Sequence, residues 1–184
     1  MEALLVSTAV VAIAEIGDKT QLLALLLIAR HREPWPIVSG IAVATLANHA
    51  IAGAVGTWLV QALGPDAMRW VLGISFLLMA AWALIPDSAP DAGQAPPRYG
   101  VFLTTVIAFF LVEMGDKTQI ATVALAAQFE SLAWVVVGTT AGMMLANVPV
   151  VFLGGKFLGR IRLEVVRWIA AAGFAALGLY ALLA

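Results

Sequence analysis

The chain contains no cysteine, and His31 and His49 are its only histidines. The missing thiols exclude disulfides, thiolate metal sites and cysteine nucleophiles. With so few imidazoles, an intramembrane hydrolase that activates water on a histidine-bound metal is a weak candidate. Lysine and arginine form no long basic run and the formal net charge is −1, so we expect no nucleic-acid partner. These absences do not favour an enzyme.

Charged residues are also scarce, at 11% of 184 positions, whereas hydrophobic residues make up 62%. Such a composition is typical of integral membrane proteins. Apolar segments that are long enough to cross a bilayer, or nearly so, are predicted at 4–28, 36–62, 68–85, 100–127, 132–154 and 165–183. The first segment carries ionisable residues and lacks a basic start, which predicts a retained helix rather than a signal peptide. We therefore predict an all-α integral membrane protein with six transmembrane helices.

The two halves of the chain match each other. At an offset of 98 residues, Arg69-Trp70 aligns with Arg167-Trp168 and Phe76 with Phe174, while Ala47-Asn48 aligns with Ala146-Asn147 after one insertion. Because each half has three predicted helices, an odd number, the second half would enter the membrane from the opposite side, as an inverted repeat. The predicted units are repeat 1 (1–86), a linker (87–98) and repeat 2 (99–184).

Basic residues concentrate on one side of this arrangement. If the helices alternate in direction, seven lysines and arginines fall on one side and only Arg69 on the other. The seven are Arg30, Arg32, Arg98, Lys156, Arg160, Arg162 and Arg167. Cytoplasmic loops of membrane proteins carry such an excess. We predict a multi-pass protein of the cell's inner (plasma) membrane, with the linker in the cytoplasm and both termini outside it.

One heptapeptide occurs twice, each time inside an apolar segment: residues 15–21 read EIGDKTQ and residues 113–119 read EMGDKTQ. Charges at bilayer depth cost about 2.5 to 3.5 kcal/mol each on insertion scales, so the duplicated motif indicates function. On a continuous helix, the acids and the lysine of each copy project from one face, and the glycine permits close packing or local unwinding. Since inverted repeats would place both motifs near the midplane, we expect four carboxylates to line one cavity. They are Glu15, Asp18, Glu113 and Asp116.

The predicted cavity offers oxygen ligands. Matching neutral side chains come from Thr20, Gln21, Asn48, Thr118, Gln119 and Asn147. Oxygen ligands suit hard cations such as Ca²⁺, Mg²⁺ and Mn²⁺. Four carboxylates with Lys19 and Lys117 carry a net charge of −2, which one divalent cation neutralises. An empty site would take up protons instead, which is the physical basis of cation/proton exchange. We expect the two lysines to hold the carboxylates in place.

Other interpretations remain open at this point. Ion pairs between Glu15 and Lys19, and between Glu113 and Lys117, could merely fix helix register, but they would leave both aspartates unpaired. A cation channel could use the same acids as a filter without proton coupling. An exporter of a small organic cation or amino acid is a further alternative.

The motif Glu-apolar-Gly-Asp-Lys/Arg-Thr/Ser, present twice in a six-helix protein, resembles the signature of the transmembrane-protein-165-like family of divalent cation exchangers, within the lysine-exporter superfamily. Both copies fit at every position, and the resemblance covers the full chain. It implies a secondary active transporter that exchanges Mn²⁺ or Ca²⁺ for protons, with Glu15, Asp18, Glu113 and Asp116 as the ion-binding residues. Bacterial relatives are associated with manganese export, and the short linker favours a compact prokaryotic member.

From these observations together we expect Mn²⁺ efflux coupled to proton influx, with Ca²⁺ as the alternative ion. The expected partners are the transported ion and the lipid bilayer. We expect no prosthetic group, and a homo-oligomer remains open.

Overall fold

The computed structural model describes residues 1–86, 100–129, 131–154 and 162–183. Within these ranges every regular element is a helix, which confirms the all-α class. The helices are α1 (Glu2–Glu15), α2 (Lys19–His31), α3 (Pro34–Ala83), α4 (Gly100–Glu113), α5 (Lys117–Phe129), α6 (Leu132–Leu153) and α8 (Leu163–Leu183). The predicted linker at 87–98 and three of the basic residues used for orientation, Arg98, Lys156 and Arg160, lie outside the described residues.

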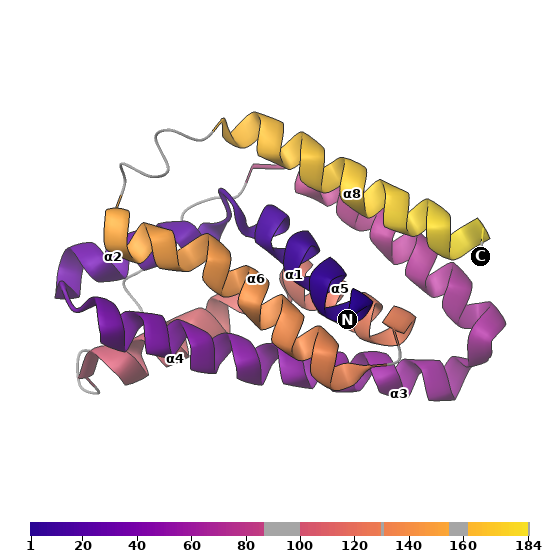
Figure 1. Cartoon of the computed structure of the whole chain (residues 1–184), viewed down its shortest axis with the longest axis horizontal. Coiled ribbons are helices and arrows are strands. Elements are labelled where there is room, and N and C mark those ends of the chain that lie inside the picture. Colours follow the sequence, from indigo (N-terminus) through magenta and orange to yellow (C-terminus); the bar gives the residue numbers. More distant parts are fainter. Residues whose placement is uncertain (87–99, 130, 155–161, 184) are drawn as a thin grey trace.

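Helix α3 consists of two straight parts joined by a kink at Gly64. This residue has φ 74° and ψ 169°, a conformation that glycine adopts far more readily than other residues. The parts are Pro34–Gly64 and Asp66–Ala83, close to the predicted segments 36–62 and 68–85. After the kink the chain turns back and runs beside α8 (Figure 1).

Within the described ranges, four helical segments are long and apolar enough to cross a membrane: Pro34–Gly64, Asp66–Ala83, Leu132–Leu153 and Leu163–Leu183. The segments that carry the heptapeptides differ, because each is interrupted at its motif. The prediction of continuous helices at 4–28 and 100–127 is therefore wrong at these points. The resulting helices have 14 or 13 residues. At 1.5 Å per residue they measure about 20 Å, which is shorter than the hydrocarbon core of about 30 Å.

Helix packing repeats between the two halves. A Cβ atom added to Gly40 would lie 2.9 Å from the carbonyl oxygen of Phe102, and one added to Gly138 would lie 2.7 Å from that of Leu4. Each member of one contact aligns with a member of the other at the offset of 98 residues. Glycine is needed at both positions because the helix backbones approach so closely. Thus α3 packs on α4 as α6 packs on α1.

The two repeats also meet through a matched aromatic pair. Phe76 of α3 and Phe174 of α8 stack with their ring centroids 6.4 Å apart, and both side chains are almost fully buried. These two residues align at the same offset of 98. A contact between equivalent residues is what an approximate two-fold axis between the repeats would produce.

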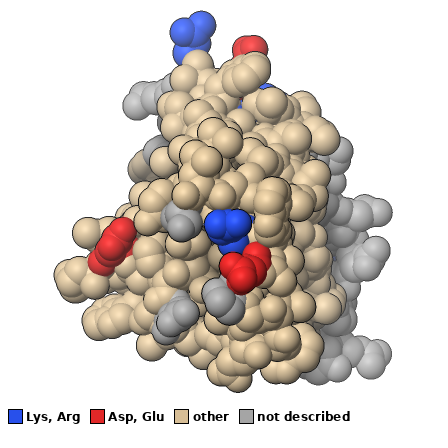
Figure 2. Space-filling view, turned by 90° about the vertical axis from the view of Figure 1, so that its right-hand side faces the viewer, with Lys and Arg blue, Asp and Glu red and all other residues tan. Residues whose placement is uncertain are grey.

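The outer surface is strongly apolar. Figure 2 shows a face on which only a few lysine, arginine, aspartate and glutamate side chains interrupt the other residues. Large side chains such as Leu78, Leu145 and Tyr180 are more than 60% exposed. Meanwhile, many polar and charged side chains, including all four motif carboxylates, are buried. Apolar outside and polar inside is the distribution of a protein surrounded by lipid, so the fold indicates a multi-pass membrane protein.

Candidate ion-binding site

Each heptapeptide forms a break between two helices. In the first copy, α1 ends at Glu15, Gly17 has φ 85°, and Asp18 is the N-cap of α2. The Asp18 carboxylate accepts a hydrogen bond from the backbone N–H of Thr20 at 3.4 Å, as N-cap side chains do. The second copy repeats the pattern, with φ 76° at Gly115. The expectation that acids and lysine share one helix face is therefore wrong, because glutamate and aspartate come from opposite helix ends.

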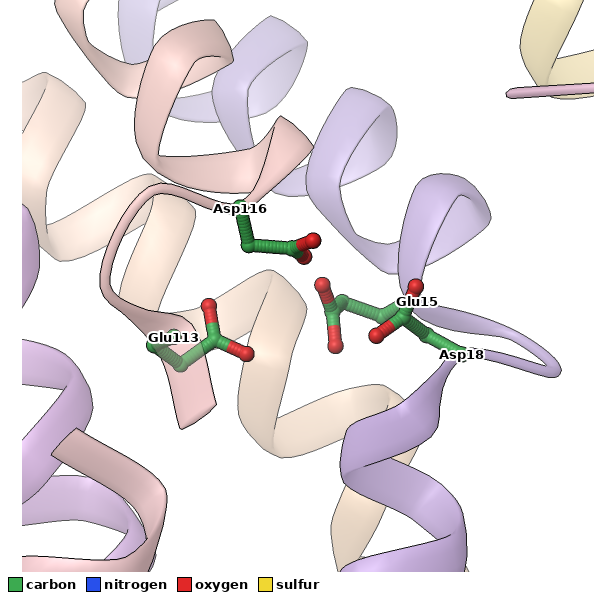
Figure 3. Close-up of side chains that lie close together, drawn as sticks. All are labelled: Glu15, Asp18, Glu113 and Asp116. Atoms are coloured by element: carbon green, nitrogen blue, oxygen red, sulfur yellow. The ribbon is translucent and has the colours of Figure 1, made fainter. Parts of the chain in front are cut away.

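The four motif carboxylates nevertheless meet. Each provides one oxygen atom such that all four oxygens lie within 4.8 Å of one another. Figure 3 shows the side chains of Glu15 and Asp18 pointing toward those of Glu113 and Asp116 across the gap between the two breaks. None of the four residues is more than 2% exposed. The predicted convergence is confirmed as geometry, and the role of these residues as ion ligands stays a prediction.

Both lysines reach across the site to the other repeat. Lys19 Nζ lies 3.0 Å from Asp116 Oδ1, and Lys117 Nζ lies 2.5 Å from Asp18 Oδ1. The pairs are equivalent under the repeat but not equally buried, since the Lys19 side chain is 24% exposed and that of Lys117 is 5% exposed. Both aspartates are thus paired, which contradicts the interpretation in which the lysines serve only their own glutamates.

The threonines orient the glutamates. Thr20 Oγ1 donates to Glu15 Oε2 at 2.5 Å, and Thr118 Oγ1 donates to Glu113 Oε2 at 2.9 Å. Among the described residues, the second oxygen of each glutamate, Oε1, is buried without a hydrogen-bond partner, and so is Oδ2 of Asp116. A buried polar atom without a partner costs free energy unless something binds it. Three such oxygens in one acidic cluster are available to a cation.

Both glutamine side-chain oxygens accept hydrogen bonds from the backbone of the breaks. Gln21 Oε1 accepts from the backbone N–H of Gly17 at 2.8 Å, and Gln119 Oε1 accepts from that of Gly115 at 2.7 Å. Their expected part in supporting the ion stays a prediction. Because the acceptor is four residues beyond the donor in each case, the bond ties the glycine of the break to the first turn of the following helix.

The glutamine amides connect each break to a helix of the other repeat. Gln21 Nε2 donates to the carbonyl oxygen of Ala146 in α6 at 2.8 Å, whereas Gln119 Nε2 donates to Asn48 Oδ1 in α3. Asn48 also donates to the carbonyl oxygen of Phe110 at 3.4 Å. Asn147 donates to the carbonyl oxygen of Met143, and its Oδ1 is buried without a hydrogen-bond partner among the described residues. The two asparagines thus lie near the site in unequal environments.

Arg167 is a neighbour of the site that sequence reasoning missed. With Leu163 and Pro86 it lines a cavity of about 140 Å³ that reaches Gly17 and Asp18. The sequence marked Arg167 as one of seven basic residues on one side of the membrane and as the equivalent of Arg69, and neither observation placed it at the site. No local signal distinguished it, because its position depends on how the start of α8 packs against the first break.

Comparison with known proteins gives consistent matches. The sequence profile described as "Divalent cation/proton antiporter GDT1" matches residues 3–91 and 101–184. The chain is 51% identical over 175 residues to a protein of Vibrio cholerae serotype O1 named "Putative manganese exporter", with 95% of this chain and 87% of the relative covered. It is 30% identical over 189 residues to "GDT1-like protein sll0615" of Synechocystis sp., covering 89% and 88% of the two chains. No solved structure matches the chain.

Proposed function

Since the chain belongs to the divalent cation/proton antiporter GDT1 family, we propose that it exports Mn²⁺ from the cytoplasm in exchange for protons. The family confirms the resemblance seen in the motif and favours a coupled transporter over an acidic-filter channel or an enzyme. The choice of Mn²⁺ rests on the name of the relative from Vibrio cholerae and on the oxygen ligands of the site. The observation that carries the proposal is the buried cluster of Glu15, Asp18, Glu113 and Asp116.

The dimensions of the cluster suit one metal ion. Opposed oxygen ligands lie roughly 4.0 to 4.2 Å apart around Mg²⁺ and roughly 4.6 to 5.2 Å apart around Ca²⁺, from their usual bond lengths. Four oxygens within 4.8 Å of one another can close around an ion of this size range. An amino acid would need far more room between the carboxylates, which disfavours an exporter of small organic molecules.

Charge balance provides the exchange. The cluster and its two lysines sum to −2, so one divalent cation leaves the buried site neutral. When the ion leaves, protons on the unpartnered oxygens of Glu15 and Glu113 would restore neutrality at low cost. A site that holds either the ion or protons, but not both, couples the two fluxes in opposite directions.

We further propose that the fold is an inverted repeat with six membrane crossings. In this arrangement, α1 and α2 together cross the membrane as one discontinuous helix, and so do α4 and α5. The two breaks then place the site near the midplane of the membrane. The crossed lysine pairs and the matched packing of Gly40 and Gly138 support this symmetry. Helix ends of both kinds meet at the breaks: the C-terminal ends of α1 and α4 would attract a cation, whereas the N-terminal ends of α2 and α5 stabilise the adjacent Asp18 and Asp116 carboxylates.

The proposed units are repeat 1 (1–86), the linker (87–98) and repeat 2 (99–184). By the excess of basic residues, the linker would be cytoplasmic and both termini would lie outside the cytoplasm. The site would then face each side in turn as the repeats rock against each other.

Reconstituted vesicles test the proposed function. The purified protein is placed in proteoliposomes with a pH-sensitive dye inside, and Mn²⁺ is added outside. An antiporter that takes Mn²⁺ in must release protons, so we expect the lumen to become more alkaline in step with Mn²⁺ uptake. Asp116→Asn should abolish both signals, whereas Glu33→Gln, at an exposed residue, should retain them. Mn²⁺ uptake without any proton movement, at zero membrane potential, would indicate a channel and contradict the proposal.

A further inference from the structure

The two halves of the site carry the same residues but not the same hydrogen bonds. Gln21 donates to the backbone of Ala146, and the neighbouring Asn147 Oδ1 is buried without a partner. Gln119 instead donates to the side chain of Asn48. Ala47-Asn48 aligns with Ala146-Asn147, so the two acceptors in use, the Ala146 carbonyl oxygen and Asn48 Oδ1, belong to equivalent residue pairs of opposite repeats. One glutamine uses the backbone acceptor and the other uses the side chain.

The surroundings of the breaks are unequal in the same sense. A Cβ atom added to Gly17 would lie 2.7 Å from Leu163 Cδ2, so the start of α8 covers the first break. A Cβ added to Gly115 would meet none of the described residues within 4 Å, and Met114 is 57% exposed, while its equivalent Ile16 is partly buried. At its glycine the first break is therefore covered by α8, whereas the second is open as far as the described residues extend.

Two equivalent sequences thus make two different sets of contacts in one molecule. In an inverted repeat, rocking of one half against the other produces the opposite-facing state, and by the symmetry the halves would then exchange their contacts. That exchange would move Gln21 from the Ala146 carbonyl to Asn147 Oδ1, and Gln119 from Asn48 Oδ1 to the Ala47 carbonyl. The number of hydrogen bonds would stay the same, so the exchange would be nearly balanced in free energy.

We propose that Gln21 and Gln119 are positioning residues whose exchange of acceptors, between asparagine side chain and alanine carbonyl, accompanies reorientation of the ion site. This rests on the proposed transport cycle. Each glutamine acts through the glycine of its break, because its Oε1 atom accepts a hydrogen bond from that glycine. Its amide group donates to an acceptor in the other repeat, so a change of acceptor accompanies a movement of that repeat. Neither glutamine needs to touch the ion. Asn48 Oδ1 stabilises the conformation described here, and Asn147 Oδ1 stabilises the opposite one.

The absence of cysteine makes a direct test feasible, since one thiol can be introduced without removing any. A trifluoromethyl label on Met114→Cys reports by fluorine NMR whether the second break is open or covered in the metal-free protein. Asn48→Ala should lower the open-to-covered ratio roughly two- to tenfold, as expected for the loss of one hydrogen bond from one state. Its equivalent Asn147→Ala should raise the ratio or leave the open state saturated.

The matched pair of variants separates a switch from a merely structural role. If the substitutions merely loosened the structure, the open-to-covered ratio would change in the same direction in both asparagine variants. That result would overturn the proposal, and so would an unchanged ratio in Asn48→Ala. If either alanine variant does not fold, Asn48→Ser and Asn147→Ser replace the pair, with the same opposite shifts expected. The readout requires neither metal nor transport, so a failure of the switch is distinguishable from a failure of the vesicle experiment on Mn²⁺ and protons.

Discussion

Lys117→Met removes the more buried of the two crossed ion pairs. At 2.5 Å and an effective dielectric constant of 20, the attraction between Lys117 and Asp18 is about 7 kcal/mol, most of which offsets the cost of burying both charges. Removing one partner of a buried pair typically costs about 3 to 5 kcal/mol, because the other charge is left uncompensated. We expect the free energy of unfolding of the metal-free Lys117→Met variant to fall by this amount. Methionine retains the volume of the side chain but leaves the site with a charge of −3.

The equivalent variant Lys19→Met is the control. Its pair with Asp116 is longer, at 3.0 Å, and the lysine is 24% exposed, so solvent screening should reduce the loss to about 1 to 2 kcal/mol. The assay is thermal unfolding of the detergent-purified protein with and without Mn²⁺. A divalent ion at one hundred times its dissociation constant adds about 2.7 kcal/mol of stability, and the more acidic Lys117→Met site should gain more than the wild type. An equal loss in both variants, or no extra gain from Mn²⁺, would refute the reasoning.

Three further outcomes follow from the same geometry. Glu113→Gln removes charge and an unpartnered oxygen from the cluster, so Mn²⁺ uptake into vesicles should fall at least tenfold, and normal uptake would contradict its role as a ligand. Gly56→Ala should lower stability by roughly 1 to 3 kcal/mol in thermal unfolding, because the new Cβ would lie 2.2 Å from the Val123 carbonyl oxygen. Its control, Gly173→Ala, meets nothing within 4 Å and should be neutral or stabilising, so equal losses would refute the packing argument. Finally, Mn²⁺ affinity measured by titration calorimetry should weaken as pH falls, because protons compete for the carboxylates, and a pH-independent affinity would argue against exchange.

The duplication made the convergence of the carboxylates predictable. Matching heptapeptides in matching segments imply equivalent depth, and an odd number of helices per repeat brings equivalent positions together around one axis. The four acids do meet, within 4.8 Å. This prediction required no knowledge of the local backbone, because the symmetry alone relates Glu15 to Glu113.

The local geometry was harder to predict. Helical spacing suggests that Glu15 pairs with Lys19 four residues later, but the break at Gly17 turns Lys19 toward Asp116 instead. A glycine between apolar and charged residues is compatible with either a helix or a break. The free-energy cost of burying four carboxylates decides between a helix and a break. This cost is lower when helix ends and crossed lysines face the carboxylates. Such an arrangement depends on residues about one hundred positions away.

The unequal glutamine contacts could not be predicted from the sequence. Gln21 and Gln119 have the same neighbours in the motif, and Asn48 and Asn147 follow the same residue. Matching motifs predict matching contacts, whereas the structure holds the two glutamines on different kinds of acceptor. Distant packing, such as that of Leu163 on Gly17, accompanies the difference, so it becomes visible only in the structure.

The number of ions bound per chain tests the central claim most directly. In equilibrium dialysis with radioactive manganese, four carboxylates that form one shared site should bind a single Mn²⁺ per wild-type chain. Glu15→Gln and Glu113→Gln should each abolish binding at concentrations that saturate the wild type, although they alter different repeats. Two ions per wild-type chain, with one retained in each variant, would show two independent half-sites and contradict the account.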